Sequence, residues 1–275
     1  MSARGRRVPT VGIVLLAVLA TAITACDSDT DGGTAPSSTS TPRSPVTDVY
    51  EVPDQLRDAT MVWSADPEVD LFSTEGTLTR ATQESIVIGM TTGLDYTYIG
   101  FAGSGNYKGG DSMYSIFQSE TGEGPFAGTV RGHIQQIVPN DVGFDAVTCV
   151  LSVGLDVLEN DKYSPSLVTD VEGGELRIRF IRTGDQATTP TSPAPSSGPG
   201  PENLHWQAPA GNEFIGWEID GFADTDPVTA GNGRCLSWAR SLYPDASPIV
   251  SREAYANDNP PPVQPAYPGW PDNRY

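Results

Sequence analysis

The chain has 275 residues, of which 35 are acidic and 16 are Lys or Arg, and its formal net charge is −19 at pH 7. So acidic a chain argues against binding to nucleic acid and against electrostatic attachment to anionic lipid. The length allows one globular domain with tails, whereas two full domains would be tight.

The first 26 residues combine a basic head, an apolar stretch and a cysteine. Three arginines precede the apolar residues 11–23, a stretch that is short for a transmembrane helix. The small residues before Cys26 and the acidic, Ser/Thr-rich residues after it resemble the lipobox of bacterial lipoproteins. The resemblance implies that residues 1–25 are a signal peptide and that Cys26 is acylated, for example with palmitate. The mature protein would then begin at Cys26, outside the cytoplasm and lipid-anchored to the cell membrane.

Two alternatives to this interpretation remain open. The first is an ordinary signal peptide that leaves Cys26 as a free thiol. The second is twin-arginine export through Arg6 and Arg7, although the residues that follow them fit that pattern poorly. The abundance of Ala, Gly, Pro, Thr and Asp, with two lysines in the whole chain, resembles the composition of exported actinobacterial proteins.

Residues 26–47 have the composition of a disordered tether. They contain no large apolar residue before Val46, and so cannot bury enough surface to become ordered. The run from Asp27 to Gly32 copies the first half of an EF-hand calcium loop. Position twelve of that loop would be Ser38, where a bidentate glutamate is needed, so a solvated acidic tether is favoured and no metal or other cofactor is predicted.

Period-two patterns dominate the rest of the chain and predict strands. Short strands are expected at 61–63, 69–72 and 113–117, and a β-hairpin is expected from Ile86 to Phe101 around Thr92-Gly93. Further strands are expected at 130–138, 147–157, 175–180 and 214–219. The segments 53–60 and 234–243 are expected to form short helices. The predicted fold is mostly β, an antiparallel sandwich or barrel with one or two short helices, and an α+β fold is the alternative.

The two remaining cysteines, Cys149 and Cys235, are expected to form a disulfide in an oxidising compartment. The bridge would close a loop of about 86 residues, worth up to about 4.6 kcal/mol in the loop-entropy model. Two buried free thiols are the alternative.

Three breaks in composition define the domain organisation. Residues 48–256 are expected to form a single β-rich domain with a flexible insertion at 184–204, which the predicted disulfide spans. Residues 257–275 form a Pro-rich tail with polyproline character. The tail docks on a partner, folds back on its own domain and buries Trp270, or is disordered.

No catalytic residue is assigned from the sequence. His133 and His205 are the only histidines, and His133 is expected on the polar, exposed face of a strand. The glycine-rich loop from Gly100 to Gly105 lacks the spacing of a phosphate-binding loop. Paired carboxylates suited to a glycosidase are possible at several places. These pairs are Glu120 with Glu123, Asp156 with Glu159, and Asp224 with Asp226.

These observations lead to three hypotheses about function. The favoured one is a lipid-anchored envelope protein that displays an acidic β-rich binding or scaffolding domain. Its partners would be the membrane, through the anchor, and an envelope protein or wall polymer, and not nucleic acid. The alternatives are an extracytoplasmic carboxylate-dependent hydrolase acting on glycan or peptide, and a structural accessory subunit. Enzymatic activity is the less favoured of these classes.

Overall fold

A computed structural model of the whole chain describes residues 50–105, 117, 124–165, 173–184, 204–223, 234–244 and 256–270. The chain divides into two units, Met1–Val46 and Thr47–Tyr275, and every described residue belongs to the second. The predicted signal peptide, Cys26 and residues 27–47 of the predicted tether therefore lie outside the described residues.

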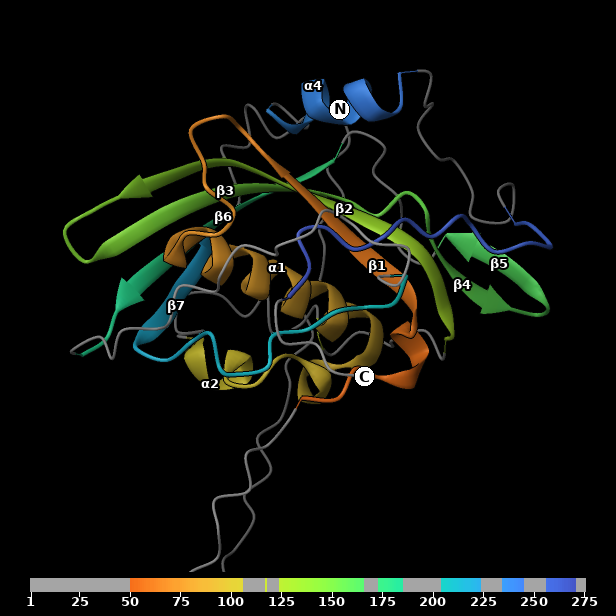
Figure 1. The fold of residues 1–275 in the computed structure, drawn as a ribbon, viewed down its shortest axis with the longest axis horizontal. Helices are drawn as coiled ribbons and strands as arrows, with labels where there is room; N and C mark the ends of the chain where they lie inside the picture. Colours follow the sequence, from red (N-terminus) through yellow and green to blue (C-terminus); the bar gives the residue numbers. More distant parts are fainter. Residues whose placement is uncertain are drawn as a thin grey trace, which may run out of the picture. The chain divides into compact units, whose positions relative to one another are not determined.

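Within the described ranges, seven strands form one curled, mostly antiparallel sheet that makes half of a barrel (Figure 1). The strands are β1 (Asp58–Ala65), β2 (Phe126–Pro139), β3 (Gly143–Leu151), β4 (Leu155–Glu159), β5 (Lys162–Pro165), β6 (Gly174–Arg182) and β7 (Trp217–Ala223). Their order is β5-β4-β2-β3-β6-β7, and β1 pairs with β2 off this path, in parallel. The prediction of a mostly antiparallel β fold with few helices is confirmed.

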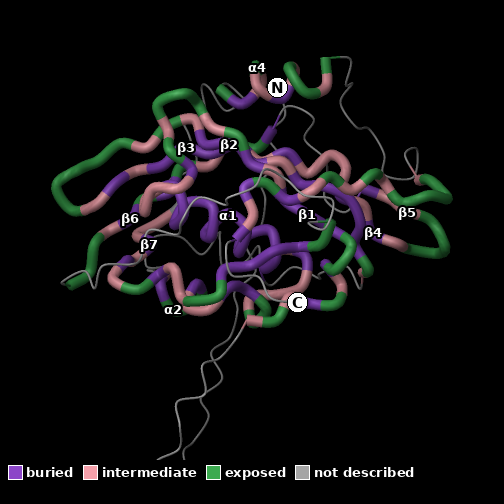
Figure 2. The backbone as a smooth tube through the Cα atoms, viewed as in Figure 1, coloured by how far each residue is buried: buried purple, intermediate pink, exposed green. Residues whose placement is uncertain are grey.

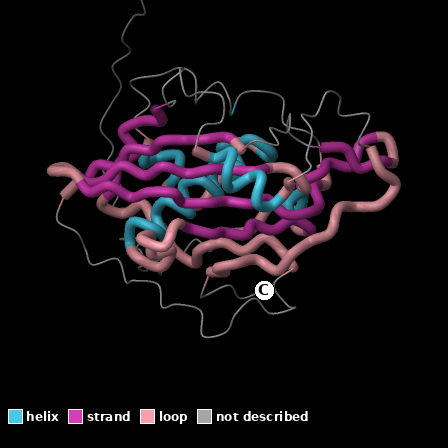
Figure 3. The backbone as a smooth tube through the Cα atoms, turned by 90° about the horizontal axis from the view of Figure 1, so that it is seen from above, coloured by secondary structure: helices cyan, strands magenta, loops and turns pink. Residues whose placement is uncertain are grey.

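The longest helix in the described part of the chain, α1 (Thr74–Thr92), lies in the hollow of the curled sheet, and Figure 3 shows the strands running across it. The predicted hairpin from Ile86 to Phe101 is therefore wrong, because its first half is helical. The Ser73 side chain accepts a hydrogen bond from the Gly76 backbone N–H at the start of the helix. Gly93, with φ of 106°, ends it in a conformation that favours glycine.

The apolar periodicity did not predict α1 because the helix is buried on nearly every side, as the continuous purple along it in Figure 2 shows. A buried helix does not need one apolar stripe, and α1 turns polar residues such as Arg80, Gln83 and Glu84 toward partners inside the domain. The shared parity of Ile86 and Ile88 therefore imitated a strand.

The other helical elements among the described residues are short. They are η1 (Asp54–Leu56), η2 (Leu94–Tyr96), α2 (Phe101–Ser104) and α4 (Cys235–Leu242). The helix predicted at 234–243 is confirmed. The one predicted at 53–60 shrinks to η1, since Asp58 already begins β1, and Leu71 lies in a turn rather than in the strand expected at 69–72.

The long strand predicted at 147–157 is two strands, and the face that they turn inward changes between them. In β3 the core receives Phe144 and Ala146, whereas in β4 it receives Leu155 and Val157. The interruption at 152–154 shifts the alternation by one residue, and a shift of one residue exchanges the two faces of a strand. Cys149 therefore points to the outer face of the sheet, not into the main core as its pattern suggested.

The described part of the Pro-rich tail folds back on the domain along the free edge of β1. Tyr267 forms a parallel bridge with Val62, and the Thr60 hydroxyl donates to the Gln264 carbonyl at 2.7 Å. Trp270 is 5% exposed, so the tail packs on its own domain. Of the predicted flexible insertion at 184–204, only the end residues Gly184 and Leu204 are described.

Candidate functional site

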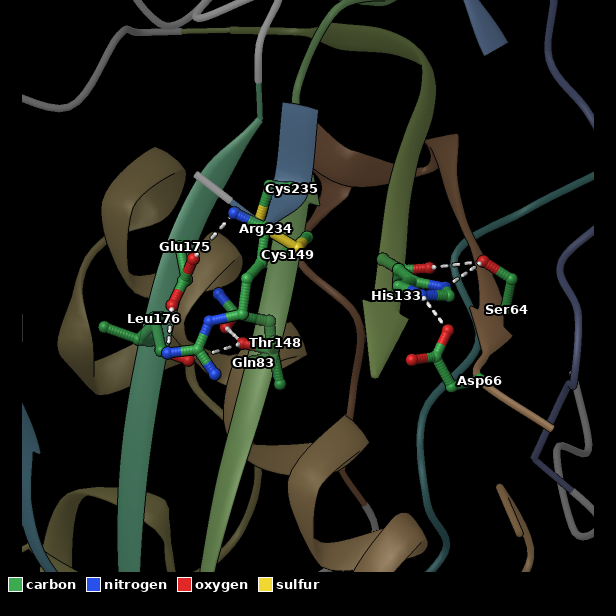
Figure 4. Close-up of a disulfide and its surroundings, with 11 residues drawn as sticks. Ser64, Asp66, Gln83, His133, Thr148, Cys149, Glu175, Leu176, Arg234 and Cys235 are labelled. Carbon is green, nitrogen blue, oxygen red and sulfur yellow. Dashed lines mark hydrogen bonds and ion pairs between the residues drawn. A yellow bond between two sulfur atoms is a disulfide. The ribbon is translucent and has the colours of Figure 1, made fainter. Parts of the chain in front are cut away.

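The predicted disulfide is present and attaches α4 to the outer face of the sheet. Cys149 of β3 and Cys235, the first residue of α4, are bonded with their Cα atoms 5.6 Å apart. Beside the bridge, an Arg234 guanidinium nitrogen lies 3.3 Å from a Glu175 carboxylate oxygen. Figure 4 shows this pair and the disulfide together. The helix is thus fixed over strands β3 and β6.

Close to this attachment, Ser64, His133 and Asp66 form a hydrogen-bonded chain of three side chains (Figure 4). Ser64 Oγ lies 2.9 Å from His133 Nδ1, and His133 Nε2 lies 3.2 Å from Asp66 Oδ1. Ser64 and His133 are direct partners in the parallel pairing of β1 with β2, so the sheet itself brings them together. Ser64 and Asp66 are exposed, whereas His133 is buried.

The hydrogen-bond directions in this chain follow from the chemistry of its ends. An ionised carboxylate only accepts hydrogen bonds, so Nε2 of the neutral imidazole carries the proton that Asp66 accepts. Nδ1 is then an acceptor, and the Ser64 hydroxyl donates to it at 2.9 Å, a shorter contact than the 3.5 Å from Ser64 Oγ to the Gly132 carbonyl. Burial lowers the pKa of His133, while the charge of Asp66 and its hydrogen bond oppose that shift. Burial thus favours the neutral imidazole, which can take up a proton.

The imidazole of His133 is also stacked against Trp238 of α4. The ring centroids are 5.3 Å apart and the planes differ by 17°. Next to them, Arg131 donates to the Tyr243 hydroxyl at 2.6 Å and lies over that ring. The expectation that His133 is exposed is wrong, because α4 covers it; the expectation that it lies on the face opposite Val130 and Ile134 is correct.

A second polar cluster lies on the inner side of the sheet, around Glu84 of α1. The carboxylate accepts hydrogen bonds from Trp63 Nε1 at 2.8 Å, from Trp270 Nε1 at 2.8 Å and from the Tyr98 hydroxyl at 2.7 Å. Burial raises the pKa of Glu84, while the charge of Arg80 and these hydrogen bonds oppose the shift. Three donors occupy the carboxylate, so it has no oxygen directed at an external molecule.

Arg80 completes this inner cluster one helical turn before Glu84. Its guanidinium donates to the carbonyls of Leu71 and Pro268 at 3.2 and 3.1 Å, and it lies 4.5 Å from the ring centre of Trp270. The cluster therefore joins α1 and the C-terminal segment, which lie far apart in the sequence. Its geometry is that of a structural network that closes the hollow of the half-barrel.

An open groove of about 460 Å³ lies beside this cluster, at the surface of the domain. Its walls combine aromatic and apolar side chains, two carboxylates and the glycine-rich loop. They are formed by Tyr50, Glu51, Leu94, Asp95, Thr97, Tyr98, Ile99, Gly100, Ala102 and Gly103. The loop from Gly100 to Gly105, which the sequence did not assign to a phosphate site, thus contributes to the groove through the one-turn helix α2.

The other residues singled out in the sequence do not join either cluster. His205 is exposed, and its ring nitrogen Nδ1 lies 3.0 Å from the Arg57 carbonyl. Asp156 and Glu159 lie on β4. The calcium-like run from Asp27 to Gly32 and the pairs Glu120 with Glu123 and Asp224 with Asp226 lie outside the described residues. Across the described ranges, no three His, Cys, Asp or Glu residues are grouped as a metal site, and no helix is long and apolar enough to span a membrane.

The sequence did not point to Ser64, Asp66 or Glu84 as site residues. The pairing of Ser64 with His133 depends on the parallel register of β1 and β2, which connects segments 69 residues apart. Comparison of the chain with protein-family models, with curated proteins and with solved structures finds no match.

Proposed function

We propose that this chain is an exported lipoprotein, anchored through acylated Cys26, whose β-rich domain serves as a binding or scaffolding module at the cell envelope. The observation that carries the proposal is the Cys149–Cys235 disulfide. The sequence has three cysteines, so this bridge leaves Cys26 as the one available for lipid. Structural disulfides persist in oxidising compartments, which agrees with an extracytoplasmic domain.

The filled interior favours binding at the surface. The α1 helix and the Glu84 cluster occupy the hollow of the sheet, so the curled sheet does not enclose a ligand in the way that a lipocalin barrel does. The groove at Tyr50 is then the better candidate, because it is open and combines aromatic, apolar and polar walls. Its carboxylates, Glu51 and Asp95, and the absence of Lys or Arg among its lining residues favour a neutral or cationic ligand over an anionic one.

The proposed tether sets the working distance of the module. Residues 26–47, as a flexible coil, would have an end-to-end distance of about 25 Å, and fully extended they would reach about 75 Å. Tyr50, which lines the groove, is three residues after the last residue of the proposed tether. A partner in or near the membrane is therefore within reach.

A carboxylate-dependent hydrolase is the second candidate, and one observation favours it. Glu51 and Asp95 line the same groove, as two acids in a glycosidase would. The fully occupied Glu84 does not qualify as an acid catalyst, so this candidate depends on the groove pair. Under this candidate, the double variant Glu51→Gln with Asp95→Asn should lose hydrolysis of glycan or peptide while the domain remains folded.

The decisive experiment on the proposal is the intact mass of native protein extracted from membranes, before and after reduction and alkylation. We expect a diacyl or triacyl mass on a chain that starts at Cys26, with two alkylated thiols that appear after reduction. The Cys26→Ser variant should lose the lipid mass and leave the membrane fraction. An unlipidated wild-type chain in the medium would contradict the anchor, and two thiols reactive before reduction would contradict the disulfide.

A further inference from the structure

We propose that Ser64 is an activated nucleophile, with His133 as its general base, and that it accepts acyl groups from neutral esters at the outer face of the sheet. The proposal goes beyond the binding function and does not depend on the groove. It starts from the chain of contacts in Figure 4, with 2.9 Å from Ser64 Oγ to His133 Nδ1 and 3.2 Å from His133 Nε2 to Asp66 Oδ1. The first contact is within the range expected between a nucleophile and its base, and the second is at the upper limit of the range expected between the base and the group that orients it.

The protonation pattern is the one that a nucleophilic serine needs. Asp66 holds the imidazole proton on Nε2, so the lone pair of Nδ1 faces the hydroxyl of Ser64. The roles of the two ring nitrogens are exchanged relative to the usual serine triad, but the sequence of nucleophile, base and carboxylate is the same. Serine, base and carboxylate are recognised by these roles rather than by their place in the chain.

The base is held in position before any substrate arrives. His133 is on the central strand β2, directly opposite Ser64, and Trp238 stacks on its ring. The disulfide at Cys235 fixes the helix that carries Trp238. A base whose orientation is already restricted loses little conformational entropy in the reaction.

The nucleophile is accessible although its base is not. Ser64 and Asp66 are exposed near the end of β1, whereas His133 is shielded by α4. An ester carbonyl can therefore approach Ser64 Oγ from solvent, and the imidazole does not contact bulk water to the same degree. The exposed carboxylate of Asp66, two residues after the serine, disfavours an anionic acyl donor and favours a neutral one.

The proposed step is an ordinary acyl transfer. Ser64 Oγ forms a bond to the carbonyl carbon of the ester while its proton passes to His133 Nδ1. The carbon–oxygen bond to the alcohol then breaks, and His133 returns the proton to the departing alkoxide, which leaves as alcohol. Water attacks the Ser64 ester by the same route, which releases the carboxylic acid and restores the hydroxyl.

The test is covalent labelling of the purified full chain with a fluorophosphonate, which bonds to activated serine oxygens, followed by intact mass and peptide mapping. We expect one adduct, on Ser64, that is lost in Ser64→Ala. The matched control is Ser152→Ala, which removes a serine from the turn between β3 and β4 and should label as the wild type does. Because Ser64 is exposed, Ser64→Ala should unfold at the same temperature as the wild type. Loss of the adduct would then not be caused by loss of folding.

The roles of His133 and Asp66 are tested by the labelling rate. His133→Gln should label about 100-fold more slowly, the size of a lost general base. In the wild type the rate should rise with pH to a plateau reached by pH 7, because His133 loses its proton below its ordinary pKa of about 6.5. Asp66 positions the base, and Asp66→Asn should slow labelling and move the midpoint of this rise to lower pH, because the carboxylate supports the protonated imidazole.

Charged groups near His133 contribute to the pH dependence of the labelling rate. Among the described residues, the charged and titratable groups on this outer face include Asp66 after β1, Arg131 with Tyr243, the pair Glu175 with Arg234 beside the disulfide, and Asp145 of β3 with Arg177 and Arg179 of β6. Replacement of Arg234 by Gln should therefore leave the midpoint near that of the wild type. No adduct, an adduct that persists in Ser64→Ala, or a rate that climbs steadily to pH 10 without a plateau would each overturn the proposal.

Discussion

The two sides of the sheet carry similar polar side chains in opposite settings. On the inner side, the Glu84 carboxylate is fully buried and accepts three hydrogen bonds from two tryptophans and a tyrosine. On the outer side, the Asp66 carboxylate is exposed and accepts one hydrogen bond from His133. Because the Glu84 carboxylate is fully hydrogen-bonded inside the protein, the inner cluster has a structural role. The outer chain of side chains ends in the exposed hydroxyl of Ser64, which another molecule can reach. Burial and completeness of bonding, rather than residue type, separate the two.

Replacement of Glu84 should have the largest effect on stability and should act on the inner side of the sheet. In Glu84→Gln one carboxylate oxygen becomes an NH₂ group, which must face at least one N–H or O–H donor, and Arg80 loses the nearby negative charge. We expect a loss of about 3–5 kcal/mol in the free energy of unfolding, measured by urea denaturation. The matched control, Glu68→Gln at an exposed position, should change it by less than about 0.5 kcal/mol. A Glu84 variant as stable as its control would remove the structural role of the inner cluster.

Loss of the disulfide should have the next largest effect and should act on the outer side. The double variant Cys149→Ser with Cys235→Ser is expected to lose about 2–4 kcal/mol of unfolding free energy, because the unfolded chain is no longer constrained over 86 residues. Release of α4 should also expose His133 and slow the labelling of Ser64. A variant with wild-type stability and labelling rate would show that Trp238 and Arg234 hold α4 without the bridge.

Acidification should have the smallest effect, again on the outer side. Burial lowers the pKa of His133 in the folded protein, so below pH 6.5 the unfolded chain binds more protons than the folded one. The His133 contribution is absent at pH 7.5 and becomes destabilising as pH falls through 6.5 toward the folded pKa. Thermal unfolding at pH 7.5 and 5.5 should therefore show a larger loss in the wild type than in His133→Gln. Equal losses would mean that the folded pKa of His133 is not lowered.

Sequence patterns predicted the outer half of the domain better than the inner half. The alternation in β2 and β6, the helix α4 and the disulfide are local or compositional features, and each is confirmed. For α1 the apolar periodicity predicted a strand. A helix surrounded by protein needs no polar face toward water, so its apolar residues can match the two-residue period of a strand as well as the 3.6-residue period of a helix. The reversal of faces between β3 and β4 depended on the turn at Gly154, where the positive φ of 97° breaks the alternation.

The sequence alone predicts the β-rich character of the chain, the pairing of its two internal cysteines and a lipid anchor at Cys26. The first follows from the alternation of apolar residues, the second from the number of cysteines, and the third from the resemblance of the residues around Cys26 to a lipobox. Tertiary structure decided that Ser64 meets His133, that Glu84 meets Trp270 and that the Pro-rich tail closes on β1. Each of these contacts joins segments that lie 60 residues or more apart. Their contact depends on strand order, register and the direction of each face, which a single sequence does not encode in any local pattern.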